Sequence, residues 1–290
     1  MRAWIFACLV ACTGSAPGDQ NHPSDSAAGS ADAPASQSID APAGRDLSTD
    51  RTKFFGASRC ADANVMLCED FESGTLDTGT WQTVGTAPVI DTVQAARGTH
   101  ALHVHLNANG ASYIKETKTF PALKGNYYGR AFVYFAHLPV VSGAFTYSHW
   151  TILASTTSIG EIRISGQMQN GKNLFGVGTD SGNNMAGTGD WTNSDADPNN
   201  QPRAVPTGEW ECLEWQHDST NNVTHVWWDD VAHPSLDTTA SDHGGNTNPY
   251  DIPDITAAWF GWQEYQTSTE EFEMWVDEIA VDKDRIGCVI

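Results

Sequence analysis

Four side chains in the second half of the sequence belong to types that could process a charged sugar. They are an imidazole, a guanidinium, an amide and a phenol, namely His149, Arg163, Gln167 and Tyr265. Removing the proton next to the carboxylate of a uronic acid requires that the carboxylate charge be neutralised, which Arg163 or Gln167 could do. It also requires a base within hydrogen-bond reach, which His149 or Tyr265 could be. These residue types therefore indicate β-elimination.

Hydrolysis is the competing chemistry. It needs two carboxyl groups about 5 to 9 Å apart, and Glu161 with Glu214 or Glu264 could supply them. Nothing in the spacing of these residues favours that pairing. A third interpretation is a solvated sheet face with cross-strand ion pairs.

The segment 161–167 alternates between polar and apolar residues. In a β-strand this places Ile162 and Ile164 on one face and the polar residues on the other. Because the isoleucines must pack inward, we expect Glu161, Arg163 and Gln167 to project together into an open groove.

Tryptophans accompany these polar residues. Exposed indole rings suit sugars, whose C–H faces stack on them, although indoles also fill sandwich cores. Adjacent strand residues face opposite ways, so only one of Trp227 and Trp228 can point into the core. The residues expected to contact substrate are Trp150, Glu161, Trp228 and Trp262.

Segments of strand-like composition fill the sequence beyond residue 100, with Gly- and Asn-rich turns between them. The predicted strands are 101–106, 112–119, 127–135, 149–154, 161–167, 173–178, 210–218, 222–228, 257–265 and 273–281. No window predicts a helix of three turns. The sequence therefore predicts an all-β fold, a two-sheet antiparallel β-sandwich of jelly-roll type.

The N-terminal residues resemble an export signal. Met1 and Arg2 precede a short apolar stretch that ends in the letters LVAC, which resemble the lipobox of bacterial lipoproteins. We expect residues 1–11 to be a lipoprotein signal peptide and Cys12 to be lipidated; an ordinary signal peptide is the alternative. Residues 12–52, rich in Ser, Ala, Asp and Pro, are predicted to be a disordered tether, and residues 53–290 the jelly-roll domain. The expected location is the bacterial outer membrane or cell surface.

The charge of the chain limits its partners. The formal net charge is -21, which argues against nucleic acid and against an electrostatic attraction to anionic lipid. The lipid anchor is therefore the only membrane contact that we expect, and we expect a monomer.

Four cysteines fall in the predicted domain: Cys60, Cys68, Cys212 and Cys288. In an exported chain an even number indicates disulfides, of which three pairings are possible. The short spacing favours Cys60 with Cys68, which leaves Cys212 for Cys288. A zinc site is the alternative, but no pair has CxxC spacing.

Two acids near opposite ends of the domain could share a cation. First and last strands of a sandwich often pair, which would bring Glu72 and Asp277 together. Calcium is the natural partner for such carboxylates outside the cell, and two independent surface acids are the alternative.

Three short motifs carry a family resemblance. They are FESG at 71–74, RGTHAL at 97–102 and VDEI at 276–279, and together they resemble the frame of concanavalin A-like sandwiches. With the four residues named first, the chain resembles polysaccharide-lyase-like secreted proteins, a family that includes fungal cellulose-induced proteins and glucuronan lyases.

The resemblance implies a jelly roll with a structural Ca²⁺ on Glu72, Asp277 and main-chain oxygens near Arg97 and His100. It also implies a catalytic cleft formed by His149, Arg163, Gln167 and Tyr265. Glu161 departs from the family pattern, which has a histidine at this position of the cleft, and its charge would repel a uronate.

The expected function is that of an exported, lipid-anchored polysaccharide-active protein, with lyase activity on a glycan that contains uronic acid. The alternative is a non-catalytic carbohydrate-binding surface lipoprotein. A surface adhesion domain without a sugar site is the third possibility.

Overall fold

The computed structural model describes residues 58–139, 147–169, 171–179, 190–243, 251–266 and 270–288. All of them belong to one compact unit, Ala41–Ile290. The predicted signal peptide, Cys12 and the tether up to residue 52 lie outside the described residues. None of the helices described is long and apolar enough to cross a membrane.

The described residues confirm an all-β fold. A 3-10 turn, η2 (Arg59–Ala61), and a one-turn helix, α1 (Phe120–Leu123), accompany fifteen strands. The strands are β1 (Leu67–Glu69), β2 (Trp81–Gly85), β3 (Val89–Asp91), β4 (Ala101–Leu106), β5 (Ala111–Glu116), β6 (Asn126–His137), β7 (Tyr147–Thr156), β8 (Glu161–Gln169), β9 (Lys172–Thr179), β10 (Asp190–Ser194), β11 (Trp210–Asp218), β12 (Val223–Trp228), β13 (Val231–Ala232), β14 (Ala257–Glu264) and β15 (Phe272–Asp282).

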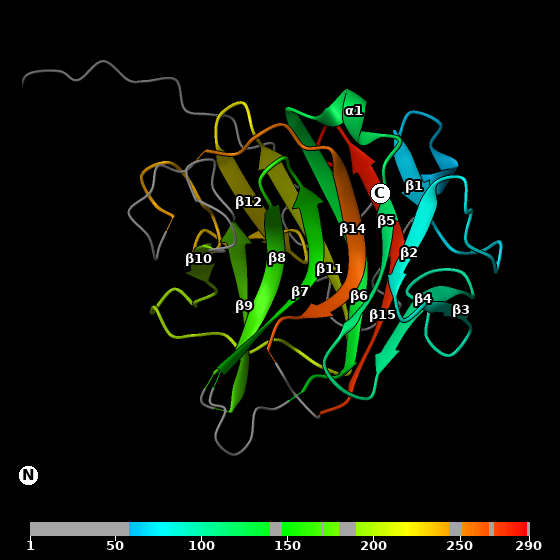
Figure 1. The fold of residues 1–290 in the computed structure, drawn as a ribbon, viewed down its shortest axis with the longest axis horizontal. Helices are drawn as coiled ribbons and strands as arrows, with labels where there is room; N and C mark the ends of the chain where they lie inside the picture. The colour runs from blue at the N-terminus through cyan, green and yellow to red at the C-terminus, as the bar shows by residue number, and fades with distance from the viewer. Residues whose placement is uncertain are drawn as a thin grey trace, which may run out of the picture. The chain divides into compact units, whose positions relative to one another are not determined.

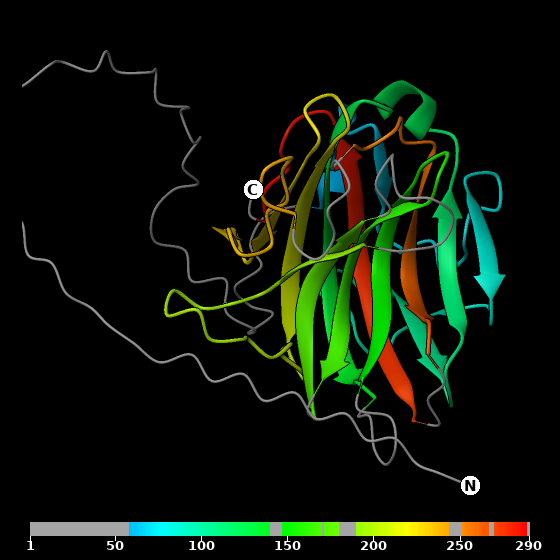
Figure 2. The same ribbon diagram turned by 60° about the vertical axis from the view of Figure 1, so that its left-hand side comes forward.

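The strands form two antiparallel sheets, as predicted (Figure 1). The eight-stranded sheet has the order β13-β12-β11-β6-β15-β4-β3, with β1 paired to β15. The seven-stranded sheet has the order β10-β9-β8-β7-β14-β5-β2. Figure 2 shows the strands of the two sheets as two layers. The apolar faces of these layers enclose the main core, which includes Ile162, Ile164 and Phe260.

Two glycines make room in the core for indole rings. Gly129 lies opposite Trp215 in the register of β6 and β11, and Gly166 lies opposite Trp150 in the register of β8 and β7. A Cβ atom at either glycine would come within 2.0 Å of a carbon of the facing ring. Each indole therefore occupies the volume that a side chain would take, one in each sheet.

Both predicted disulfides are present. Cys60 bonds to Cys68, and Cys212 bonds to Cys288 across 76 residues. The second disulfide belongs to a small apolar cluster on the outer face of the eight-stranded sheet, together with Phe132, Trp210 and Trp275. Two disulfides are typical of chains that mature in an oxidising, exported environment.

Candidate functional site

The four residues predicted to be catalytic share the outer face of the seven-stranded sheet. Ile162 and Ile164 are fully buried in the core, so Arg163 points away from it, as the alternation predicts. His149 of β7 lies directly opposite Gln167 of β8. Tyr265 directly follows β14, and its backbone N–H donates to the carbonyl of His149 at 3.1 Å. Three neighbouring strands therefore bring these side chains together.

Arg163, Tyr265 and His149 form the centre of this face. The guanidinium carbon of Arg163 lies 5.2 Å from the centroid of the Tyr265 ring, within the range of a cation–π contact. The imidazole of His149 meets the same ring edge-on, with 6.5 Å between centroids. Tyr265 is 37% exposed, whereas Gln167 is nearly buried and donates from Nε2 to Ser194 Oγ at 3.1 Å. A ligand on this face would therefore meet the phenol first.

His149 is held by a residue that the sequence analysis did not single out. Gln266 Oε1 lies 2.6 Å from the backbone nitrogen of His149 and 3.0 Å from its Nδ1. Because a backbone N–H can only donate, this atom of Gln266 is the oxygen, and Nδ1 must carry the ring proton. The lone pair of the neutral imidazole is then on Nε2. Burial lowers the pKa of His149, and the charge of Arg163 lowers it further, whereas the hydrogen bond to Gln266 raises it. The net decrease favours the neutral imidazole.

Glu161 is tied to neighbours within the site. Its Oε1 accepts a hydrogen bond from Trp259 Nε1 at 2.8 Å, and its Oε2 lies 3.4 Å from Arg163 Nε. Tyr113 stacks on the indole of Trp259 with 4.4 Å between centroids. Glu161 therefore faces the guanidinium of Arg163.

Two of the tryptophans predicted to contact substrate lie in the core. Trp150 and Trp262 are fully buried, and their rings stack on each other 5.2 Å apart. The prediction that they contact substrate is therefore wrong. The physical reason is strand alternation: Trp150 follows His149 in β7 and must face the opposite way. The aromatic residues that the outer face does carry are Tyr113 and Tyr265.

Trp228 belongs to the other sheet. It packs against the main core, with its ring 4.6 Å from that of Phe175. Its neighbour Trp227 lies under the guanidinium of Arg285, at 4.6 Å. Since Trp228 packs inward from the other sheet, it does not line the face that carries Arg163, and the structure does not bring it together with the predicted catalytic residues.

Neither proposed partner of Glu161 for hydrolysis lies on the same sheet face as Glu161. Glu264 faces the sandwich interior, where Ser148 Oγ donates to it at 2.9 Å. Burial raises the pKa of Glu264 to about 7. Glu214 lies in the eight-stranded sheet, where Arg285 Nη2 donates to it at 2.7 Å. The carboxyl pairs that we considered for hydrolysis are therefore not formed.

The predicted calcium ligands surround one short loop. Asp277 Oδ2 accepts hydrogen bonds from the backbone N–H groups of Ala96 and Arg97, at 2.8 and 3.0 Å. Glu72 Oε1 accepts from the backbone N–H groups of Thr99 and His100, both at 2.8 Å. The two acids thus bind opposite ends of the same loop. Arg97 and His100 contact them through backbone N–H groups, whereas the prediction placed main-chain oxygens near these residues on the cation.

A β-bulge in β15 points Asp277 toward this loop. The register with β6 shifts between Asp277 and Ala280, and Glu278 has a positive φ of 51°. As a result, Asp277 and its neighbour Glu278 both contact Arg97, although adjacent strand residues normally face opposite ways. Among the described residues, Asp277 Oδ1 is buried without a hydrogen-bond partner. An orphaned carboxylate oxygen of this kind fits a hard cation such as Ca²⁺.

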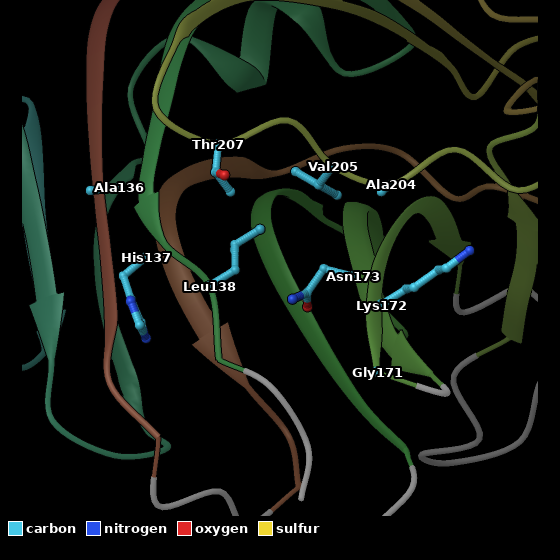
Figure 3. A pocket seen from close by; sticks show the side chains of 9 residues that line it. All are labelled: Ala136, His137, Leu138, Gly171, Lys172, Asn173, Ala204, Val205 and Thr207. Carbon is cyan, nitrogen blue, oxygen red and sulfur yellow. The ribbon is translucent and has the colours of Figure 1, made fainter.

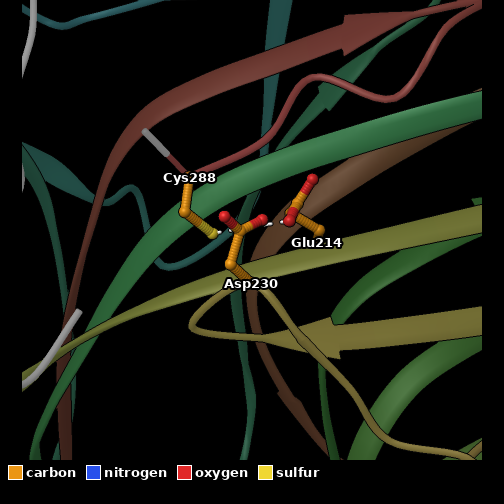
Figure 4. A group of neighbouring side chains, drawn as sticks. All are labelled: Glu214, Asp230 and Cys288. Carbon is orange, nitrogen blue, oxygen red and sulfur yellow. Dashed lines mark hydrogen bonds between the residues drawn. The ribbon is translucent and has the colours of Figure 1, made fainter. Parts of the chain in front are cut away.

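A second cluster of ligand-type side chains is not a metal site. Glu214, Asp230 and Cys288 converge within 4.8 Å of one another (Figure 4). The sulfur of Cys288 is bonded to Cys212, and Arg285 pairs with both acids. These contacts therefore attach the C-terminal segment, through Arg285 and Cys288, to the eight-stranded sheet.

A pocket of about 370 Å³ lies where the end of β6 approaches the start of β9 (Figure 3). Leu138 and Val205 form part of its wall, with Lys172 at the rim. The amide of Asn173, which also lines it, is already bonded to Trp150 Nε1 and to the carbonyl of Pro139. No residue predicted to be catalytic lines this pocket.

No family model matches the sequence, and no curated protein matches it. Among solved structures, the fold is similar to that of Cellulose induced protein, Cip1, with 22% identity over 77% of this chain and 99% of that one, and a TM-score of 0.53. Domain 4 of AbnA, a GH43 extracellular arabinanase from Geobacillus stearothermophilus solved with arabinotriose, aligns with 12% identity over 78% and 95% of the two chains, at a TM-score of 0.46. The binding domain of botulinum neurotoxin serotype G aligns with 9% identity over 78% and 49%, at 0.45. The likeness to Cip1 shows the β-sandwich fold.

Proposed function

We propose that this domain binds an acidic polysaccharide on the outer face of the seven-stranded sheet and cleaves it by β-elimination. One observation carries the proposal: His149 and Arg163 approach the ring of Tyr265 from two neighbouring strands. A base and a cation gathered around one phenol are the groups that this reaction needs.

Each residue has a defined task in the proposed reaction. The Arg163 guanidinium neutralises the uronate carboxylate, which acidifies the adjacent C–H bond. Nε2 of neutral His149 takes that proton, and the electron pair forms a carbon–carbon double bond as the glycosidic C–O bond breaks. The phenol of Tyr265 donates its proton to the departing sugar oxygen. No water enters the products.

Non-catalytic binding of a glycan is the second candidate, and Glu161 favours it. Its carboxylate lies 3.4 Å from the Arg163 side chain and neutralises part of its positive charge, which weakens the attraction of Arg163 for a uronate carboxylate. In that case the exposed Tyr265 would stack on a sugar that carries no charge.

We further propose that the chain is exported and lipid-anchored through Cys12, and that Ca²⁺ joins Asp277 to Glu72. The two disulfides support export, and the orphaned Asp277 oxygen supports the cation. The cation would serve to fix the loop at residues 96–100. In the cleavage reaction it has no task.

The decisive experiment incubates the chain with glucuronan, alginate or pectin and follows the far-ultraviolet absorbance of the unsaturated product. We expect absorbance to rise with one of these polymers, and His149→Ala and Arg163→Ala to abolish the rise. His225→Ala, on the other sheet, is the matched control and should be unaffected. Glycan pull-down without unsaturation would replace the lyase proposal by the binding one, and failure of both would contradict any sugar function.

A further inference from the structure

The outer face of the eight-stranded sheet carries a second group of histidines and acids, unrelated to the proposed sugar site. It lies where β3, β4 and β15 run side by side (Figure 1). The members of this histidine cluster are Asp91, His103, His105, Glu271 and Glu273. All are partly exposed, so solutes can reach them.

Three ligand-type side chains of the cluster project from one small area of sheet, although in this structure their ligand atoms do not all lie within 4.8 Å of one another. His103 and His105 are two residues apart in β4 and therefore share a face. Glu273 of β15 lies directly opposite His105. Two imidazoles from one strand and a carboxylate from the next thus project from the same small area of sheet.

Two neighbours fix the ring of His103 in an orientation that is typical of metal-binding histidines. Its ring stacks on Trp275 at 4.1 Å with an interplanar angle of 10°. Its Nδ1 lies 2.7 Å from Asp91 Oδ2, and Asp91 itself accepts a hydrogen bond from Trp275 Nε1 at 3.0 Å. An imidazole whose Nδ1 donates to a carboxylate presents Nε2 to a metal. Here Nε2 lies 3.0 Å from Glu273 Oε1.

We propose that His103, His105 and Glu273 bind one divalent transition-metal ion, such as Zn²⁺ or Cu²⁺. Imidazole nitrogens with one carboxylate favour these ions over Ca²⁺, which prefers oxygen ligands. The ion takes the place of the direct 3.0 Å contact between His103 Nε2 and Glu273 Oε1, and any proton on Nε2 passes to solvent.

One side chain must turn to complete the site. The rings of His103 and His105 are nearly parallel, with 6.2 Å between centroids, and His105 Nε2 lies 2.7 Å from Glu271. Binding requires His105 to leave this carboxylate and direct Nε2 toward Glu273. An exposed contact of this kind is weak, and the metal–nitrogen bond replaces it.

The test titrates Zn²⁺ into the full chain, carrying no histidine tag, by calorimetry in the presence of excess Ca²⁺. We expect one ion per chain, with His103→Ala and His105→Ala each weakening the affinity by roughly tenfold or more, and Asp91→Asn by about 10- to 100-fold. With Cu²⁺, electron paramagnetic resonance should show two coupled nitrogens. The control is His225→Ala, because His225 also pairs with a carboxylate, Asp237, at 2.9 Å on the same sheet and has an exposure matching that of His105.

Thermal unfolding separates a lost site from a lost fold. His105 is more exposed than His103, so His105→Ala should keep the wild-type midpoint even if His103→Ala does not. Wild-type protein that binds no Zn²⁺, or that binds it no better than His105→Ala, would overturn the proposal. So would an equal loss of affinity in His225→Ala.

Discussion

His149 donates both its backbone N–H and its ring Nδ1–H to one atom, the side-chain oxygen of Gln266. The double contact fixes the direction of the ring and the position of its proton together. Gln266 is thus a positioning residue for the proposed base, although it lies beyond the last residue of β14.

The protonation of His149 should differ from that of an ordinary histidine. Burial lowers its pKa below the usual 6.5, so the folded chain binds fewer protons there than the unfolded chain when the pH falls through this value. We therefore expect its imidazole to stay neutral below pH 6.5, and its contribution to stability to decline only as the pH drops below that point. A histidine NMR titration measures this directly.

Gln266→Leu is the matched variant for that titration. Removing the acceptor should release Nδ1 and shift the tautomer mixture toward Nε2–H, which ¹⁵N chemical shifts report. A wild-type His149 that titrates at or above 6.5, or a tautomer unchanged in Gln266→Leu, would contradict this account.

Glu161→Gln should strengthen binding of an acidic oligosaccharide. The amide keeps an oxygen for the Trp259 N–H but removes the charge beside Arg163. We expect the affinity to rise by about two- to fivefold, the effect of one partly exposed ion pair. Calorimetry with a uronate oligomer measures the change. Asp254→Asn, which removes an exposed charge paired with Lys124, controls for net charge, and an equal gain there would refute the local explanation.

Calcium should raise the unfolding temperature of the chain. An ion that binds only the folded state at about 100 times its Kd adds about 2.7 kcal/mol, and EGTA should remove that gain. Asp277→Asn keeps an oxygen for the loop N–H groups but withdraws the charge, so its midpoint should no longer respond to Ca²⁺. Differential scanning fluorimetry suffices, and a variant that still responds fully would exclude Asp277 as a ligand.

Gly129→Ala and Gly166→Ala should each destabilise the domain. The added methyl group would meet Trp215 or Trp150 at 2.0 Å, and overpacking of a core typically costs about 1–3 kcal/mol. Gly110→Ala is the control, because only a leucine methyl lies near its Cβ position, at 3.9 Å. Urea unfolding measures all three, and a wild-type midpoint for Gly166→Ala would show that the indole can move aside.

The sequence predicted the inner strands well and missed the outer ones. The ten predicted segments match β4 to β9, β11, β12, β14 and β15, with ends differing by a few residues. The unpredicted β2, β3, β10 and β13 are the four edges of the two sheets, and β1 pairs only with β15. Edge strands are short and half-solvated, so they lack the apolar alternation that reveals a central strand.

The site was predictable where alternation decides which way a residue faces. Ile162 and Ile164 fix the direction of Arg163, and that inference is confirmed. The same rule, applied to His149 and Trp150, would have placed Trp150 in the core. Gln266 gave no signal, because its role depends on how the chain turns after β14. The catalytic roles themselves stay predictions.

β15 pairs with three other strands of the eight-stranded sheet, β1, β4 and β6. It is also made after every other strand of the domain. β4 pairs with β3 on its other side and β6 with β11, so each lacks its second neighbour until synthesis has passed residue 282. Completion of this sheet and formation of the Cys212–Cys288 disulfide therefore both depend on the last residues of the domain to be synthesised.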